Sequence, residues 1–178
     1  MKEVLVILLL VLILCLTVGC QNKAAIAELE EFRAQAALEK ANKALAERFI
    51  EAAFNKPDLD ALKEILSPDY VHHPQLGTDE SLDEALRGLQ QRTTMFPDQA
   101  ITVEDMFVKG NKIAWRGIFS GTHSGDIEGF PATGKKVKMR GFSILRIENG
   151  KIVEAWGGRD LLSLYKQLGF ELRPKEEK

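Results

Sequence analysis

The sequence has few cysteines and few histidines. Its two cysteines are Cys15 and Cys20, and none follows Cys20. A domain formed by the rest of the chain therefore has no disulfide, no cysteine nucleophile and no thiolate ligand for a metal. The histidines number three, at His72, His73 and His123. We therefore expect the domain to depend on its hydrophobic core for stability.

An excess of positive charge is also missing. The chain has 24 lysines and arginines against 26 aspartates and glutamates, for a formal net charge of −2. Proteins that bind nucleic acid usually carry a basic patch, and here the aromatic residues are not interleaved with arginines. We therefore expect no nucleic-acid partner. The length of 178 residues is enough for one domain with a real core.

A long apolar run occurs only at the N-terminus, over residues 4–16. This run is shorter than the roughly 20 residues that a membrane-spanning helix needs, but it suits an export signal. The pentapeptide LTVGC, which ends at Cys20, resembles a bacterial lipobox, in which the cysteine carries the lipid. We therefore expect a signal peptide over residues 1–19, lipidation of Cys20, and an exported protein anchored to a bacterial membrane by its lipid. An uncleaved anchor helix is the alternative.

The first half of the remaining chain has the 3.6-residue period of helices. We expect helices over residues 20–41 (a solvated stalk), 45–54, 58–66 and 82–94. Asp58 and Ser81 are the expected N-caps of the third and fourth of these. Residues 69–74 have the pattern of a short extended edge closed by a proline, and a loop is expected over residues 75–80.

The second half has the two-residue period of strands. We expect strands over residues 101–109, 112–123, 135–148 and 151–156, and a closing helix over residues 161–168. Asn149-Gly150 predicts a type I′ hairpin turn. Helices followed by an antiparallel meander predict an α+β fold with helices on one face of a curved sheet. We expect one domain over residues 42–172, followed by a polar tail over residues 173–178.

Alternation within the strands predicts which side chains share a sheet face. The expected helix-facing side chains are Ile113, Trp115, Phe119 and His123 in one strand, Val137, Met139, Leu145 and Ile147 in the next, and Ile152, Glu154 and Trp156 in the last. Gly117 and Gly141 fit bends in a curved sheet. A curved sheet closed by helices leaves a conical apolar interior, which suits a small-molecule ligand.

Residues 120–137 read SGTHSGDIEGFPATGKKV and contain four glycines and a histidine. A phosphate-binding loop needs a helix after its glycines, and a strand follows here, so we exclude a phosphate site. Neighbouring His72 and His73 point to opposite faces of a strand, so at most one of them lies on the same face as His123. We therefore expect no metal site.

Three segments, GTHSGDIEGFPATGKKV, ILRIENGKIVEAWGGRD and LYKQLGF, together resemble the SnoaL-like polyketide cyclase (ester cyclase) family. The resemblance extends over about residues 42–170. It implies the nuclear transport factor 2-like cone and acid/base cyclisation or isomerisation of a small apolar or polyketide-like molecule, without a metal or organic cofactor. It also implies a catalytic aspartate at Asp160, in an intramolecular aldol-type ring closure. Folds of this type often pair through the open sheet face, so we expect a homodimer.

Other interpretations of these positions stay open. Asp160 also suits the cap of the closing helix. The cyclases place polar partners where this chain has Ile144 and Arg146, and this departure favours a non-catalytic ligand-binding or interaction lipoprotein on the same fold. Arg159 could form an ion pair with Asp160.

The candidate site residues form two groups. We expect catalytic help for Asp160 from His123 or His73, with a hydrogen bond between His123 and Asp126 as the alternative for His123. The expected ligand-binding residues are His72, Trp115, Phe119, Met139, Phe142, Glu154 and Trp156. An ion pair of Glu154 with Arg140 or Arg116 is the alternative role for that carboxylate.

Overall fold

The computed structural model describes residues 2–75, 77–127 and 130–171, without the side chains of residues 2–22 and Gln75. Two compact units divide the chain between residues 40 and 41. Helix α1 extends over Lys2–Ile50. Where side chains are described, no helix combines the length and the apolar character needed to cross a membrane. The side chains of the expected signal peptide and of Cys20, and the tail over residues 173–178, lie outside the described residues.

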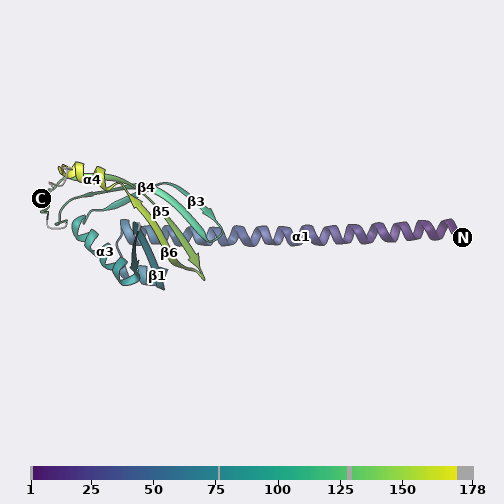
Figure 1. Cartoon of the computed structure of the whole chain (residues 1–178). Coiled ribbons are helices and arrows are strands. Elements are labelled where there is room, and N and C mark those ends of the chain that lie inside the picture. The colour runs from purple at the N-terminus through teal and green to yellow at the C-terminus, as the bar shows by residue number, and fades with distance from the viewer. Residues whose placement is uncertain (1, 76, 128–129, 172–178) are drawn as a thin grey trace. The chain divides into compact units, whose positions relative to one another are not determined.

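The second unit contains the sheet and its helices (Figure 1). After α1 come a π-helical turn at Glu51–Asn55 and the helices α2 (Leu59–Ile65), α3 (Leu82–Met95) and α4 (Leu161–Leu168). The strands are β1 (Leu66–Gln75), β2 (Thr78–Ser81), β3 (Ala100–Lys109), β4 (Lys112–Thr122), β5 (Lys136–Glu148) and β6 (Lys151–Arg159). They form one sheet in the order β2-β1-β6-β5-β4-β3, antiparallel except between β1 and β6. The α+β prediction and the cone are confirmed.

The capping and turn predictions are confirmed at three places. Asp58 accepts hydrogen bonds from the first-turn amides of α2. Ser81 donates to the Glu84 carboxylate at the start of α3, both from its backbone N–H and from its hydroxyl. Asn149 and Gly150 both have positive φ, of 50° and 73°, as a type I′ turn requires.

The predictions for residues 66–81 need correction. Residues 75–80, expected as a loop, include most of β2, which pairs with β1 after a turn at Gly77 (φ 80°). The expected edge strand β1 therefore lies inside the sheet, between β2 and β6. Its parallel pairing with β6 joins residues about 80 positions apart, which local periodicity does not reveal.

A bulge in β6 changes the faces of its side chains. Arg146 pairs with Glu154, but the next residue, Ile147, pairs with Ile152, so Val153 is an extra residue in β6. Ile152 and Ala155 are both buried, whereas Val153, Glu154 and Trp156 are only partly buried. The prediction that Ile152, Glu154 and Trp156 share a face is therefore wrong.

Candidate functional site on the inner face of the sheet

The two faces of the sheet have different surroundings. We call the face that carries Ile113, Leu145 and Ala155 the inner face, because these side chains are buried in the core that the helices complete. The opposite side is the outer face. Trp115, Phe119 and Met139 lie on the inner face and are buried, as predicted from the alternation. Gly141, Ser143, Gly157 and His72 share this face but are only partly buried, so this part of the inner face is less covered than the core.

His72 is the partly buried histidine of the inner face. It pairs in register with Ala155, and its Nδ1 lies 2.8 Å from Oε2 of Glu80 on β2. Because an ionised carboxylate only accepts hydrogen bonds, this contact places a proton on Nδ1. The other nitrogen, Nε2, lies over Gly157, 3.9 Å from where a Cβ would sit on that glycine. His72 and Glu80 thus form an oriented pair whose Nε2 is directed along the inner face.

Tyr70 lies two residues before His72 on the same strand and is buried. Burial raises the pKa of its hydroxyl far above the usual value, and the charge of Glu80 raises it further. The phenol therefore stays neutral at any physiological pH and adds no charge beside the His72–Glu80 pair.

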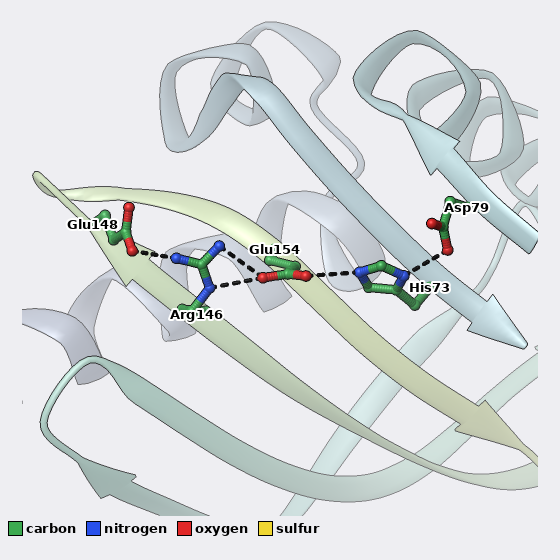
Figure 2. Close-up of polar contacts among 5 residues, drawn as sticks. All are labelled: His73, Asp79, Arg146, Glu148 and Glu154. Carbon is green, nitrogen blue, oxygen red and sulfur yellow. Dashed lines mark hydrogen bonds and ion pairs between the residues drawn. The ribbon is translucent and has the colours of Figure 1, made fainter. Parts of the chain in front are cut away.

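His73, by contrast, belongs to the outer face, and Figure 2 shows its surroundings. Its Nδ1 lies 2.7 Å from Asp79 and its Nε2 lies 2.9 Å from Glu154. Glu154 also accepts from Arg146 at 2.7 Å, and Arg146 in turn contacts Glu148. The His73 ring stacks on Trp156, with ring centroids 5.2 Å apart. Both ring nitrogens of His73 are thus occupied.

The outer-face network fixes the charges of its members. The hydrogen bonds to Glu154 and then to Asp79 raise the pKa of His73. Burial acts to raise the pKa of Glu154, but the hydrogen bonds from His73 and Arg146 outweigh it and hold that pKa below its usual value. The network is therefore a chain of paired opposite charges, which is the arrangement of a structural ion-pair network.

His123 is completely buried at the end of the inner face. Its Nδ1 accepts from the backbone N–H of Thr133 at 3.2 Å and lies 3.0 Å from the Thr133 hydroxyl. The neutral ring then carries its proton on Nε2, which has no hydrogen-bond partner among the described residues. The expected loop contact exists, but Thr133 provides it in place of Asp126.

Asp160 forms the N-cap of α4. Its carboxylate accepts from the backbone N–H of Ser163 at 2.9 Å, and the residue is exposed. No ion pair joins it to Arg159 among the described residues. Asp160 therefore has the geometry of a helix cap, which is the alternative that the sequence analysis gave for it.

Three of the expected ligand-binding residues lie on the outer face. Phe142 is 57% exposed and covers Gly158, while Glu154 and Trp156 belong to the His73 network. Glu154 and Trp156 point outward because the bulge at Val153 shifts the alternation of side chains in β6 by one residue. Phe142 alternates with the inner-facing Gly141 and Ser143, which already predicts its outward direction. The carboxylate of Glu154 has neither Arg140 nor Arg116 as its partner, since Arg146 and His73 take that place.

Arg92 on α3 is a site residue that the sequence analysis does not identify. Its guanidinium donates to the carbonyl of Ala53 at 2.6 Å and to Gln99 at 2.9 Å, and lies 4.1 Å from the centre of the Phe54 ring. Phe54 packs edge-on against the inner-face Trp115, with centroids 5.9 Å apart. The amphipathic pattern of residues 82–94 gives no sign that this arginine turns inward. As for metals, the described residues contain no cluster of three or more acidic, histidine or cysteine side chains that could hold an ion.

Comparison with known proteins identifies the family. The model of the SnoaL-like polyketide cyclase family matches residues 44–168. The chain belongs to this family. The aklanonic acid methyl ester cyclase DnrD of Streptomyces peucetius is 28% identical over 132 residues, covering 70% of this chain and 88% of DnrD.

Solved structures of similar proteins support the same fold. IdmH from Streptomyces antibioticus is 33% identical with a TM-score of 0.66, covering 72% of this chain and 99% of IdmH. TsrD from Streptomyces laurentii is 31% identical with a TM-score of 0.65, covering 73% and 96%.

The departure from the SnoaL-like pattern at Ile144 and Arg146 falls on the outer face. Ile144 is 38% exposed, and Arg146 pairs with Glu154. The inner-facing neighbours on β5 are Ser143 and Leu145. The unusual residues at 144 and 146 therefore do not alter the inner face.

The charges of the outer-face network make its contribution to stability depend on pH. Because the folded state raises the pKa of His73 above the ordinary 6.5, its contribution is complete below that value and is lost as the pH rises through the folded pKa. Because the folded state lowers the pKa of Glu154, its contribution is lost as the pH falls below the ordinary 4.5. We expect the His73→Gln variant to be less stable than the wild type by about 1 kcal/mol near pH ~6, and by less near pH ~9. Urea unfolding at both pH values measures this, and an equal difference at both would contradict it.

Proposed function

We propose that this SnoaL-like protein binds a small, mostly apolar molecule on its inner face and catalyses an acid/base ring closure or isomerisation. The observation that carries the proposal is the His72–Glu80 pair, which directs Nε2 of His72 over Gly157. A histidine oriented by a carboxylate on one nitrogen and open on the other is the usual arrangement of a general base. Membership of the family supports the reaction class.

In this proposal the steps balance without an oxidant or reductant. Nε2 of His72 removes a proton from a carbon next to a carbonyl group of the ligand. The resulting enolate carbon attacks a second carbonyl of the same molecule, so a carbon–carbon bond forms and an alkoxide appears. The imidazolium, stabilised by Glu80, then returns its proton to the alkoxide. Glu80 acts here as a positioning residue.

The other candidate residues have weaker support for a direct role. The resemblance to the family implies that Asp160 is its catalytic aspartate, and we keep it in the proposal as a second acid/base group, although its carboxylate caps α4. His73 has carboxylates on both ring nitrogens. His123 is completely buried, so a ligand would reach its Nε2 only after local rearrangement.

A second candidate function is ligand binding without catalysis on the same fold. The capping role of Asp160 favours it, because a carboxylate that serves α4 need not be kept for chemistry. Only the catalytic candidate requires His72 as a base, so the role of His72 distinguishes the two candidate functions.

We expect the His72→Gln variant to lose ring closure while it keeps its fold. With aklanonic acid methyl ester, the compound in the name of the relative DnrD, as the test substrate, turnover should fall by about 10²-fold or more, since a general base contributes this much. Chromatography of the product measures the rate.

The matched control is His73→Gln, because it removes the neighbouring histidine on the outer face. This variant should keep at least about half of the wild-type rate. Turnover by His72→Gln at the wild-type rate would contradict the base assignment. Ligand binding without turnover by the wild type would support the non-catalytic candidate.

We also propose that the protein is exported and carries a lipid on Cys20. The apolar run before Cys20 and the polar Gln21 that follows it support this. Cells grown with a radioactive fatty acid should label the wild-type chain and leave the Cys20→Ala variant unlabelled. An unlabelled wild type would contradict lipidation.

A homodimer through the outer face is the remaining proposal. Phe107 is 69% exposed on this face, in one cross-strand row with Ala114 and the exposed Ile144, and apolar surface of this kind favours association. Analytical ultracentrifugation of the full chain in detergent should give twice the chain mass, and Phe107→Glu should give one chain mass. The control Leu161→Glu, which changes an exposed residue of α4, should stay dimeric; a monomeric wild type would rule out the dimer.

A further inference from the structure

Arg92 is a partly buried cation that lacks a carboxylate partner among the described residues. Its hydrogen bonds go to a backbone carbonyl and to an uncharged amide, and one face covers the Phe54 ring. Among the described residues no ion pair includes Arg92, whereas the outer-face arginines Arg116 and Arg146 each contact carboxylates. A desolvated charge without a counter-charge is costly.

Arg159 adds a second positive charge near the first. It pairs in register with Gly141, and its Cγ lies 3.8 Å from where a Cβ would sit on the inner side of that glycine. Burial, together with repulsion from Arg159, lowers the pKa of Arg92 to about 9. Arg92 is therefore still charged at neutral pH, and both cations lie on the side of the sheet that carries the inner face.

Trp115 provides an unpaired donor in the same region. Its indole Nε1 is buried and has no hydrogen-bond partner among the described residues, and its ring contacts the Phe54 ring that Arg92 covers. Two guanidinium groups and this buried N–H are all donors. An acceptor that carries negative charge would complement the three of them.

Few side-chain atoms lie close to the inner side of Gly141 and Gly157. A Cβ built on Gly141 would meet only the Gly158 carbonyl and the Arg159 side chain within 4 Å, and one built on Gly157 would meet only the Phe142 carbonyl and His72. No side chain of α3 comes that close to either glycine. The Arg159 side chain and Nε2 of His72 are therefore the side-chain atoms nearest to these two glycines.

We propose that the ligand of the inner face is an organic anion whose negatively charged oxygen, a carboxylate or an ionised phenol or enol, binds Arg92 and Arg159. The inference deepens the proposed function, since it takes the same inner face as the ligand site and names the chemical class of the ligand. The aromatic body of the ligand would lie along Gly141 and Gly157, toward Nε2 of His72. A carboxylate held by an arginine fork fixes the orientation of the molecule, which aldol-type ring closure needs.

The test compares an acid with its uncharged analogue. The probes are 1-naphthoate and 1-naphthamide, which have the same ring system, titrated calorimetrically into the full chain in matched detergent. We expect the wild type to bind 1-naphthoate at least about tenfold more tightly than 1-naphthamide. Arg92→Gln should remove this preference and leave the affinity for 1-naphthamide within about twofold.

Two further variants keep the test decisive. Arg159→Gln changes an exposed residue and should reduce the preference for the acid even if Arg92→Gln does not fold. Arg140→Gln removes an exposed arginine that faces Glu104, on the outer face, and should keep the full preference. Equal affinity for the two probes in the wild type, no binding of 1-naphthoate at about 1 mM, or an equal loss in Arg140→Gln would overturn the proposal.

The failure of this inference is distinguishable from that of the proposed function. If only the base assignment is wrong, His72→Gln keeps its turnover while the preference for 1-naphthoate still depends on Arg92. If only the anion assignment is wrong, the preference is absent while turnover still depends on His72. The binding measurement needs no turnover, so each result is decided by itself.

Discussion

The single extra residue of β6, Val153, determines which chemistry each face of the sheet carries. Because side chains alternate along a strand, one inserted residue moves everything after it to the other side. Without the bulge, Glu154 and Trp156 would enter the core beside Ile152, and Ala155, Gly157 and Arg159 would point outward. With it, the small residues Ala155 and Gly157 face the helices and leave room there. The acidic and bulky side chains complete a charged network outside.

Because β1 pairs in parallel with β6, the two adjacent histidines of β1 also lie on opposite faces of the sheet. His72 is in register with Ala155 and His73 with Trp156, so each histidine takes the face of its partner. Two adjacent histidines thereby have unrelated roles: one is oriented by Glu80 over an open glycine, and the other joins two carboxylates on the outside. The short strand β2 provides Glu80 and Asp79, one for each face, so its formation is as important for the site as that of β1.

The sequence predicted the parts of this structure that depend on local patterns. Four strands, the closing helix, the caps at Asp58 and Ser81 and the turn at Asn149 follow from periodicity and from residue type, and the segments shared with the family predicted the cone. The faces of Trp115, Phe119 and Met139 also followed, because β4 and β5 pair without interruption there. What could not be predicted depends on pairing between distant residues. The bulge at Val153, the inward turn of Arg92 and the separate partners of His72 and His73 arise only when the sheet assembles.

The partly buried position of Arg92 fits the proposed anionic ligand better than a purely structural role. Replacing a buried charge with a well-packed apolar side chain is often neutral or stabilising, so stability alone gives no reason for an arginine at this place. Its contacts with the Ala53 carbonyl, Gln99 and Phe54 hold the guanidinium in position but do not neutralise it. Sites where a local rule of folding is broken without a compensating contact are those where function is expected to impose the residue. A cation held in place by these contacts is suited to a ligand that brings the missing negative charge with it.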